Sequence, residues 1–128
     1  MTDYSVLDLV PVREGGTVSD ALAAATKLAV AAEQAGCKRF WVAEHHAMDG
    51  IAGGATSVVL AHIGNATSTI RIGPAVVVLP LHNPLRIVEN AAFVDILTDG
   101  RFIMGLGSGY RPYEFEGFGV PLEPRDVE

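Results

Sequence analysis

Short apolar runs recur along the chain at nearly constant spacing, and each of the first three is followed by a segment of helical character. The runs begin near residues 5, 39, 71 and 101, which gives spacings of 34, 32 and 30 residues. Such a period accommodates a strand, a loop, a helix and a second loop, and it is too long for a meander of antiparallel strands. The sequence therefore predicts an α/β fold of four βα units, in which parallel strands form one sheet and right-handed crossovers join them.

Turn and capping residues set the expected limits of these elements. Pro11 closes the first run, Gly36 ends the first helix, and Asn83 followed by Pro84 is a helix cap with a first-turn proline. We expect strands at 5–10, 39–43, 70–79 and 101–106, and helices from Ser19 to about Gln34, from Thr56 or Ser57 to about Asn65, and from Asn83 to Leu97.

Three of the four strands open with an arginine in front of apolar residues: Arg39, Arg71 and Arg101. These positions lie at the amino ends of parallel strands, the end of an α/β fold that usually contributes stability rather than chemistry. We expect these arginines to form ion pairs around that rim.

The composition limits the class of protein. The chain of 128 residues is long enough for one domain, 1–128, which ends in a loop and short helix from about residue 107. A hydrophobic share of 49% against 19% charged residues predicts either a well-covered sheet or an exposed patch that awaits a partner. The net charge of −6 disfavours nucleic acid as a partner.

Several features predict a cytoplasmic protein without a membrane partner. The single cysteine, Cys37, cannot form an internal disulfide and suits a reducing compartment. The first residues, MTDYSVLDLV, lack the basic start and long apolar run of a signal peptide. No stretch approaches the ~20 apolar residues of a membrane span.

The stretch WVAEHHAMDG places Glu44, His45 and His46 at the carboxyl end of the second strand, where α/β folds keep their functional face. Neighbouring residues there point to opposite sides, so one histidine at most faces a central cavity. That histidine is either a general acid–base or ligand-binding group, or part of a polar loop in solvent. The spacing offers no third ligand, so we expect no metal site.

Polar groups also stand at other strand ends. His82 follows the third strand beside the cap residue Asn83, either at the functional face or as a plain loop residue. Asp8 lies within the first strand on the face of Val6 and Val10, where a carboxylate must pair locally or line a polar cavity.

Glycines follow the fourth strand at 105, 107 and 109, but Tyr110 stands where a dinucleotide-binding pattern needs another glycine. We expect these glycines to let the backbone turn over something at the carboxyl end of the sheet. The next stretch, GYRPYEFEGFG, carries Arg111, Glu114 and Glu116 among aromatic residues. It is either a lid over the site or the apolar face of a short helix.

The stretches SVLDLVPVREG, RFWVAEHHAM, STIRIG, LPLHNPLRIVENAAFVDILTDGR and GLGSGYRPYEFEGFGVP together resemble the luciferase-like flavin monooxygenases, in order and over almost the whole chain. The resemblance implies a (βα)8 barrel that uses reduced flavin mononucleotide (FMN) and molecular oxygen to oxidise an aldehyde-like small molecule. A related branch uses the deazaflavin F420 for hydride transfer without oxygen.

By this resemblance, His45 and His46, with Glu44, form the catalytic corner beside the flavin ring. Val78, Leu79, Gly107 and Ser108 would lie against the ring, and Asp8 completes the expected cofactor-binding set. The family often has an unusual cis peptide bond at the end of the third strand.

Length limits what the resemblance implies. Eight units need roughly 250 residues, so four units make half of a barrel, with two open sheet edges and a bare inner face. We therefore expect a half-barrel fragment that self-associates as a homodimer, lacks much of the phosphate site, and binds no cofactor or turns over little alone. The alternatives are a monooxygenase that becomes active on dimerisation, and an F420- or flavin-dependent hydride-transfer enzyme. The mixed resemblance to both branches also fits a chimeric or engineered half barrel.

Overall fold

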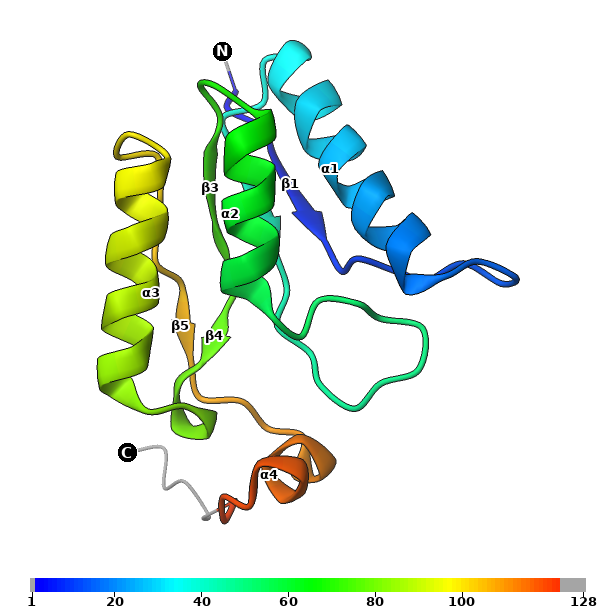
Figure 1. Cartoon of the computed structure of the whole chain (residues 1–128), viewed down its shortest axis with the longest axis vertical. Coiled ribbons are helices and arrows are strands. Elements are labelled where there is room, and N and C mark those ends of the chain that lie inside the picture. The colour runs from blue at the N-terminus through cyan, green and yellow to red at the C-terminus, as the bar shows by residue number, and fades with distance from the viewer. Residues whose placement is uncertain (1, 123–128) are drawn as a thin grey trace.

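The computed structural model describes residues 2–122 and contains two short parallel sheets that continue one another (Figure 1). The first sheet has the order β1-β2-β3, and the second pairs β4 with β5. The strands are β1 (Ser5–Asp8), β2 (Arg39–Val42), β3 (Arg71–Pro74), β4 (Val77–Val78) and β5 (Leu106–Gly107), and the helices are α1 (Val18–Gln34), α2 (Thr56–Ala66), α3 (Pro84–Leu97) and α4 (Pro112–Phe118), with a 3-10 turn, η1 (Leu79–Leu81), before α3.

The strands are parallel and in chain order, which confirms the predicted α/β class. In the register of the first sheet, Phe40 of β2 lies between Val6 of β1 and Ile72 of β3. A single parallel bridge between Ile72 and Phe102 connects this sheet to the fourth chain segment, which then pairs with β4 as β5. The crossovers place α1, α2 and α3 on the same side of the strands.

The third predicted strand, 70–79, is divided in the structure. It ends at Pro74, a cis peptide bond joins Ala75 to Val76, and pairing resumes at β4. Proline has no N–H for the ladder, so a strand commonly ends there. The strand expected at 101–106 is likewise reduced to the bridge at Phe102 and to β5.

The helix limits agree closely with the expected ones, except for one cap. Thr17, rather than Ser19, caps α1: its hydroxyl accepts a hydrogen bond from the Asp20 N–H, and the Asp20 carboxylate accepts one from the Thr17 N–H. This reciprocal pair is a capping box, and the cap lies two residues before the expected one, so that the helix begins at Val18. Asn83 caps α3 as predicted, through a 2.9 Å bond from the Leu85 N–H.

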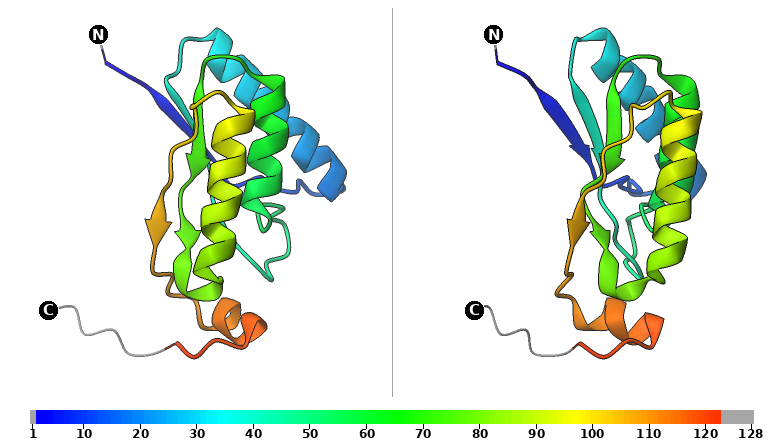
Figure 2. Two further views of the ribbon diagram at one scale, coloured as in Figure 1. Left: turned by 60° about the vertical axis from the view of Figure 1, so that its left-hand side comes forward. Right: turned by 90° about the vertical axis from the view of Figure 1, so that its left-hand side faces the viewer.

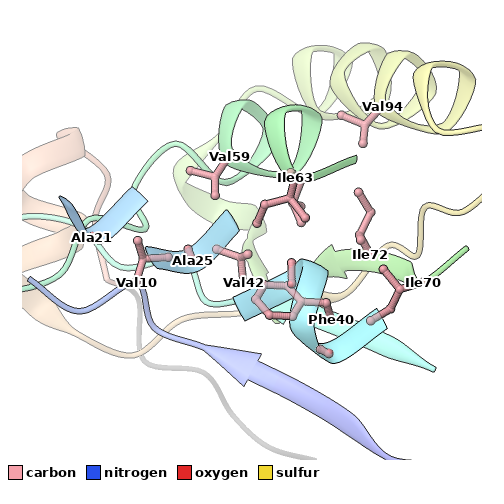
Figure 3. Packing of buried hydrophobic residues seen from close by; sticks show 13 residues of the cluster. Val10, Ala21, Ala25, Phe40, Val42, Val59, Ile63, Ile70, Ile72 and Val94 are labelled. Atoms are coloured by element: carbon pink, nitrogen blue, oxygen red, sulfur yellow. The ribbon is translucent and has the colours of Figure 1, made fainter. Parts of the chain in front are cut away.

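The main core lies between the first sheet and the helices. Phe40, Val42 and Ile72 are fully buried there (Figure 3). The alanines of α1, among them Ala25 and Ala29, let that helix approach the strands closely. A second, smaller apolar cluster consists of Val78, Leu81 and Phe115 and lies beside α4.

The opposite face of the strands is not covered by any described element (Figure 2). Leu7, Val76 and Leu106 are large apolar side chains that remain exposed, Leu7 by 58%. Among the residues that the structure describes, no helix is both long and apolar enough to cross a bilayer.

Among the residues that the structure describes, none of Arg39, Arg71 and Arg101 forms the expected ion pair. Arg101 instead directs its guanidinium at the end of α2 and at the loop after it. The Nη2 atom donates to the carbonyls of Gly64 and Thr67, and Nη1 donates to the Thr67 hydroxyl and the Ile70 carbonyl. The Nε atom donates to the Thr98 carbonyl. A helix end exposes carbonyls without intrahelical partners, and this arginine satisfies them.

Candidate functional site

Glu44 is the centre of a buried polar cluster at the carboxyl end of β2. Its side chain is nearly inaccessible, and its Oε2 accepts a hydrogen bond of 2.8 Å from the Val78 N–H. Its Oε1 contacts two imidazoles, the Nε2 of His46 at 2.6 Å and the Nε2 of His82. The cluster therefore joins residues from the ends of β2 and β4 and from the start of α3.

Helix α4 covers this cluster. The Phe118 ring lies edge-on to the His46 ring, with 4.6 Å between centroids, and to the His82 ring at 5.7 Å. The Glu114 carboxylate accepts a 2.9 Å hydrogen bond from the His46 N–H. Arg111 at the start of the helix donates to the Met48 sulfur. These contacts favour the lid over the alternative of a plain apolar helix face.

The Arg111 guanidinium donates hydrogen bonds to the hydroxyl groups of two neighbouring tyrosines. Hydrogen bonds to the hydroxyls of Tyr110 and Tyr113 raise the pKa of Arg111, so this side chain keeps its positive charge. The cation also lies over the Tyr110 ring, 5.4 Å from its centroid. The chain leading into the lid therefore carries a fixed cation.

His45 and His46 have different surroundings, as expected for neighbours that point to opposite sides. His46 belongs to the Glu44 cluster. The His45 Nδ1 is buried, makes no hydrogen bond within the described residues, and lies 3.5 Å from the Glu114 Oε1. About a fifth of the His45 side chain remains exposed (21%), so solvent reaches the ring from another edge.

Glu44, His46 and His82 are donors of the kinds that bind metal ions, and their ligand atoms lie within 4.8 Å of one another. The expectation that the chain offers no third ligand here is therefore wrong, because the fold brings His82 beside Glu44 and His46. Donors on a shared metal ion lie about 3 Å or more apart, since each bond is about 2 Å long. Here the carboxylate oxygen touches both imidazoles directly, so the three residues form a hydrogen-bonded triad.

The expected cofactor-binding residues do not all join this site. Val78 does, through its N–H, and it pairs with Gly107 in the second sheet. Leu79 begins the 3-10 turn, and Ser108 follows β5 with an exposed side chain. Asp8 pairs locally instead, because its Oδ1 accepts a 2.9 Å hydrogen bond from the Val10 N–H. That any of these residues binds a flavin stays a prediction.

The glycines after the fourth strand serve chain packing. A Cβ on Gly105 would lie 2.3 Å from the Pro74 carbonyl oxygen, and one on Gly107 would lie 2.2 Å from Val76. Gly109 has a φ of 65°, and a side chain there would collide with Val78. The neighbouring chain segments occupy the space that a side chain would need, so packing alone requires glycine at these positions, and the expected turn over a bound group stays a prediction.

Two hollows are relevant to the function, and the first of them adjoins the polar cluster. A small cavity between the starts of α2 and α3 reaches Glu44 and His82, with Arg86 and Asn90 on its α3 side. The second is an apolar hollow on the uncovered face of the strands. Its lining residues come from β1, β2 and the break between β3 and β4, together with the start of the next segment: Leu7, Trp41, Pro74, Ala75, Val76 and Gly105.

The parallel βα units and the polar cluster at the strand ends define an α/β barrel-type protein with its site at the carboxyl ends of the strands. The family model described as luciferase-like monooxygenase matches residues 2–126, and the chain belongs to that family. A luciferase-like monooxygenase of Escherichia coli K12 is 42% identical over 111 residues, which are 84% of this chain and 33% of that protein.

Solved structures agree with this assignment. The crystal structure of apo-MsnO8 superposes with a TM-score of 0.87 at 34% identity, over 92% of this chain and 36% of the other. The oxygenating constituent of 3,6-diketocamphane monooxygenase from Pseudomonas putida, solved with FMN, superposes with a TM-score of 0.87 at 19% identity. The match covers 100% of this chain and 35% of the other. A coenzyme F420-dependent tetrahydromethanopterin reductase from Methanopyrus kandleri superposes with a TM-score of 0.73 at 23% identity, and the match covers 94% of this chain and 30% of the other.

The chain spans about a third of the length of the curated relatives that it matches. This coverage and the parallel βα order confirm the expected half of a (βα)8 barrel. The sequence identified the Glu44–His46 corner but assigned no role to Glu114. The only signal for it was an acidic residue beside Phe115 and four residues before Phe118.

Proposed function

We propose that this chain forms the ring-binding part of a flavin-dependent monooxygenase barrel, and that the isolated chain has little or no turnover. The observation that carries the proposal is the buried triad of Glu44, His46 and His82 beside His45, at the carboxyl ends of parallel strands. The family relationship and the FMN in the Pseudomonas putida structure support a flavin as the cofactor.

The described residues fit the ring system of a flavin better than its phosphate. The hollow that includes Leu7, Trp41 and Val76 is apolar and open, as a flat aromatic ring requires. His45, three residues after the end of β2, offers a partly exposed imidazole. Since the phosphate of a whole enzyme would bind largely to parts of the barrel outside this chain, affinity here depends on the ring.

When bound, a reduced flavin supplies the electrons for the oxidation of a substrate by oxygen. The protein groups have separate tasks. Glu44 holds the imidazoles of His46 and His82 in place, and the apolar side chains of the hollow would contact the ring. His45 can accept or donate a proton at its exposed edge, which is the role expected of a general acid–base group.

A comparison of two ligands tests this proposal. FMN and lumiflavin, which has the ring but no phosphate, are titrated against the chain while flavin fluorescence is followed. We expect the two to bind with similar, weak affinity, and Trp41→Ala to weaken both. Leu28→Ala, on the exposed side of α1, is the control. Binding of neither ligand at millimolar protein, or FMN binding far more tightly than lumiflavin, would contradict the proposal.

Hydride transfer with F420 is the second candidate, supported by the structural likeness to the Methanopyrus kandleri reductase. A parallel titration with F420 separates the two functions. Binding of F420 without binding of lumiflavin would favour this candidate over the monooxygenase.

We further propose that the isolated chain self-associates as a homodimer through its uncovered sheet face. A large apolar surface with open strand edges is unfavourable in water and favours burial against a second copy. Sedimentation over a range of concentrations should show a dimer, and Leu7→Glu should shift it toward monomer while Leu28→Glu does not. A wild-type chain that stays monomeric at all concentrations would refute the idea. A dimer that oxidises an aldehyde would instead support the active form.

A further inference from the structure

One buried polar atom near the site has no partner. The His45 Nδ1 is inaccessible to solvent and makes no hydrogen bond to any residue between 2 and 122, the part of the chain that the structure describes. A buried nitrogen in this state is costly, by about 1–3 kcal/mol for an unsatisfied group. The nearest acidic atom is the Glu114 Oε1, at 3.5 Å. The imidazole therefore lies just beyond hydrogen-bonding distance of a carboxylate.

Glu114 can accept that hydrogen bond. Its side chain is buried at 3% exposure, and the Oε1 already accepts the His46 N–H at 2.9 Å. An ionised carboxylate has about four acceptor sites, so capacity remains for a second donor. The His46 N–H fixes the carboxylate in position, and among the other titratable groups nearby, Glu44 is hydrogen-bonded to both His46 and His82.

We propose that Glu114 is a positioning residue that holds the proton of His45 on Nδ1. The Nδ1–H···Oε1 separation would close to about 2.8 Å, the usual length of a hydrogen bond to a carboxylate. The proton on one ring nitrogen sets the state of the other, so Nε2 is left unprotonated at the accessible edge of the ring. His45 is then a base or acceptor toward whatever occupies the site.

The use of that base on a substrate rests on the proposed function, but the position of the proton does not. Without a partner at Nδ1, a histidine side chain favours the proton on Nε2. Glutamine at position 114 presents a neutral amide oxygen in place of the charged carboxylate, and this oxygen is the weaker acceptor for an Nδ1–H, so the preference for Nε2–H returns. Glu114→Gln should therefore reverse the tautomer of His45.

Nitrogen-15 NMR of the imidazole nitrogens measures the tautomer directly, with no flavin present. The signals of His45 are identified by their loss in His45→Gln. We expect mainly Nδ1–H in the wild type and mainly Nε2–H in Glu114→Gln. Glu116→Gln, on the exposed side of the same helix, is the matched control and should match the wild type.

The wild-type spectrum alone decides the proposal if the variant fails to fold. A His45 protonated mainly on Nε2 in the wild type, or an unchanged tautomer in a folded Glu114→Gln, would overturn it. If the Nδ1–H tautomer is found but neither FMN nor lumiflavin binds, this inference stands and the proposed function fails.

Discussion

Arg101 should contribute more to stability than the other two arginines at the starts of strands. Its guanidinium donates all five of its N–H groups, to four carbonyl oxygens and one hydroxyl. Arg101→Lys keeps the charge but offers three donors from a single point, which cannot reach acceptors on both α2 and the loop after α3. At least two acceptors therefore lose their partner.

The magnitude follows from these lost bonds. A hydrogen bond to a charged group contributes about 1.5–3 kcal/mol, and bonds that share one side chain are not additive. Partial exposure of the site lets water replace some of them. We therefore expect Arg101→Lys to lower the free energy of unfolding by about 2–3 kcal/mol. With a urea m-value of about 2 kcal/mol/M, the midpoint falls by about 1–1.5 M.

Urea unfolding followed by circular dichroism at one fixed protein concentration measures this shift. Arg71→Lys is the matched control, because Arg71 opens a neighbouring strand and is exposed. It should change stability by less than about 0.5 kcal/mol. Equal midpoints for the two variants would refute the reasoning that bonds to the end of α2, rather than charge at the rim, give Arg101 its effect.

Three further predictions concern local features. Burial raises the pKa of Glu33, but hydrogen bonds from the backbone N–H groups of Ile70, Thr69 and Ser68 outweigh it and hold the pKa below the ordinary 4.5. Glu33→Gln should therefore destabilise by about 1–2 kcal/mol at pH 7, and urea titrations should show this difference disappear as the pH falls through the folded-state pKa. Gly73→Ala should lower the free energy of unfolding by about 2 kcal/mol or more, because its Cβ would lie 2.1 Å from the Ile103 carbonyl oxygen. Thermal unfolding measures this loss, and Gly117→Ala, whose Cβ would meet no atom within 4 Å, should have nearly the wild-type stability. Thr17→Ala removes one half of the α1 capping box and should lower the free energy of unfolding by about 1 kcal/mol in the same assay. A loss of stability no larger than that of Val18→Ala would contradict the role of Thr17 as the cap.

Local signals predicted most of the fold. The βα period gave the class, and Asn83 with Pro84 located the start of α3 because a cap and a first-turn proline act within a few residues. Ser19 was a reasonable cap by type, but Thr17 has Asp20 at the spacing that a capping box needs. The strand pattern missed the break between β3 and β4, although Pro74 is a local signal for a strand end and the resemblance implied the cis peptide bond that follows it.

The site was less predictable because its contacts are distant in sequence. Glu44 and His46 are two residues apart, and their strand-end position was clear. His82 reaches Glu44 from 38 positions away, and Glu114 reaches the His46 N–H from 68. No spacing rule covers such pairs. The role of Arg101 was missed for the same reason, since its partners lie on α2 and after it rather than on its own strand.

The molecule has two apolar clusters of unequal size, so we expect the parts that they hold together to open at different free energies. The larger one holds the first sheet to α1 and α2, whereas α4 is secured by the small cluster of Val78, Leu81 and Phe115 and by a few polar contacts. Regions with few buried contacts open at lower free energy than the core. Amide hydrogens of α4 should thus exchange with solvent well before those of β2. In that open form the Glu44 triad is hydrated while the main sheet stays intact, so loss of the site and loss of the fold are separate events.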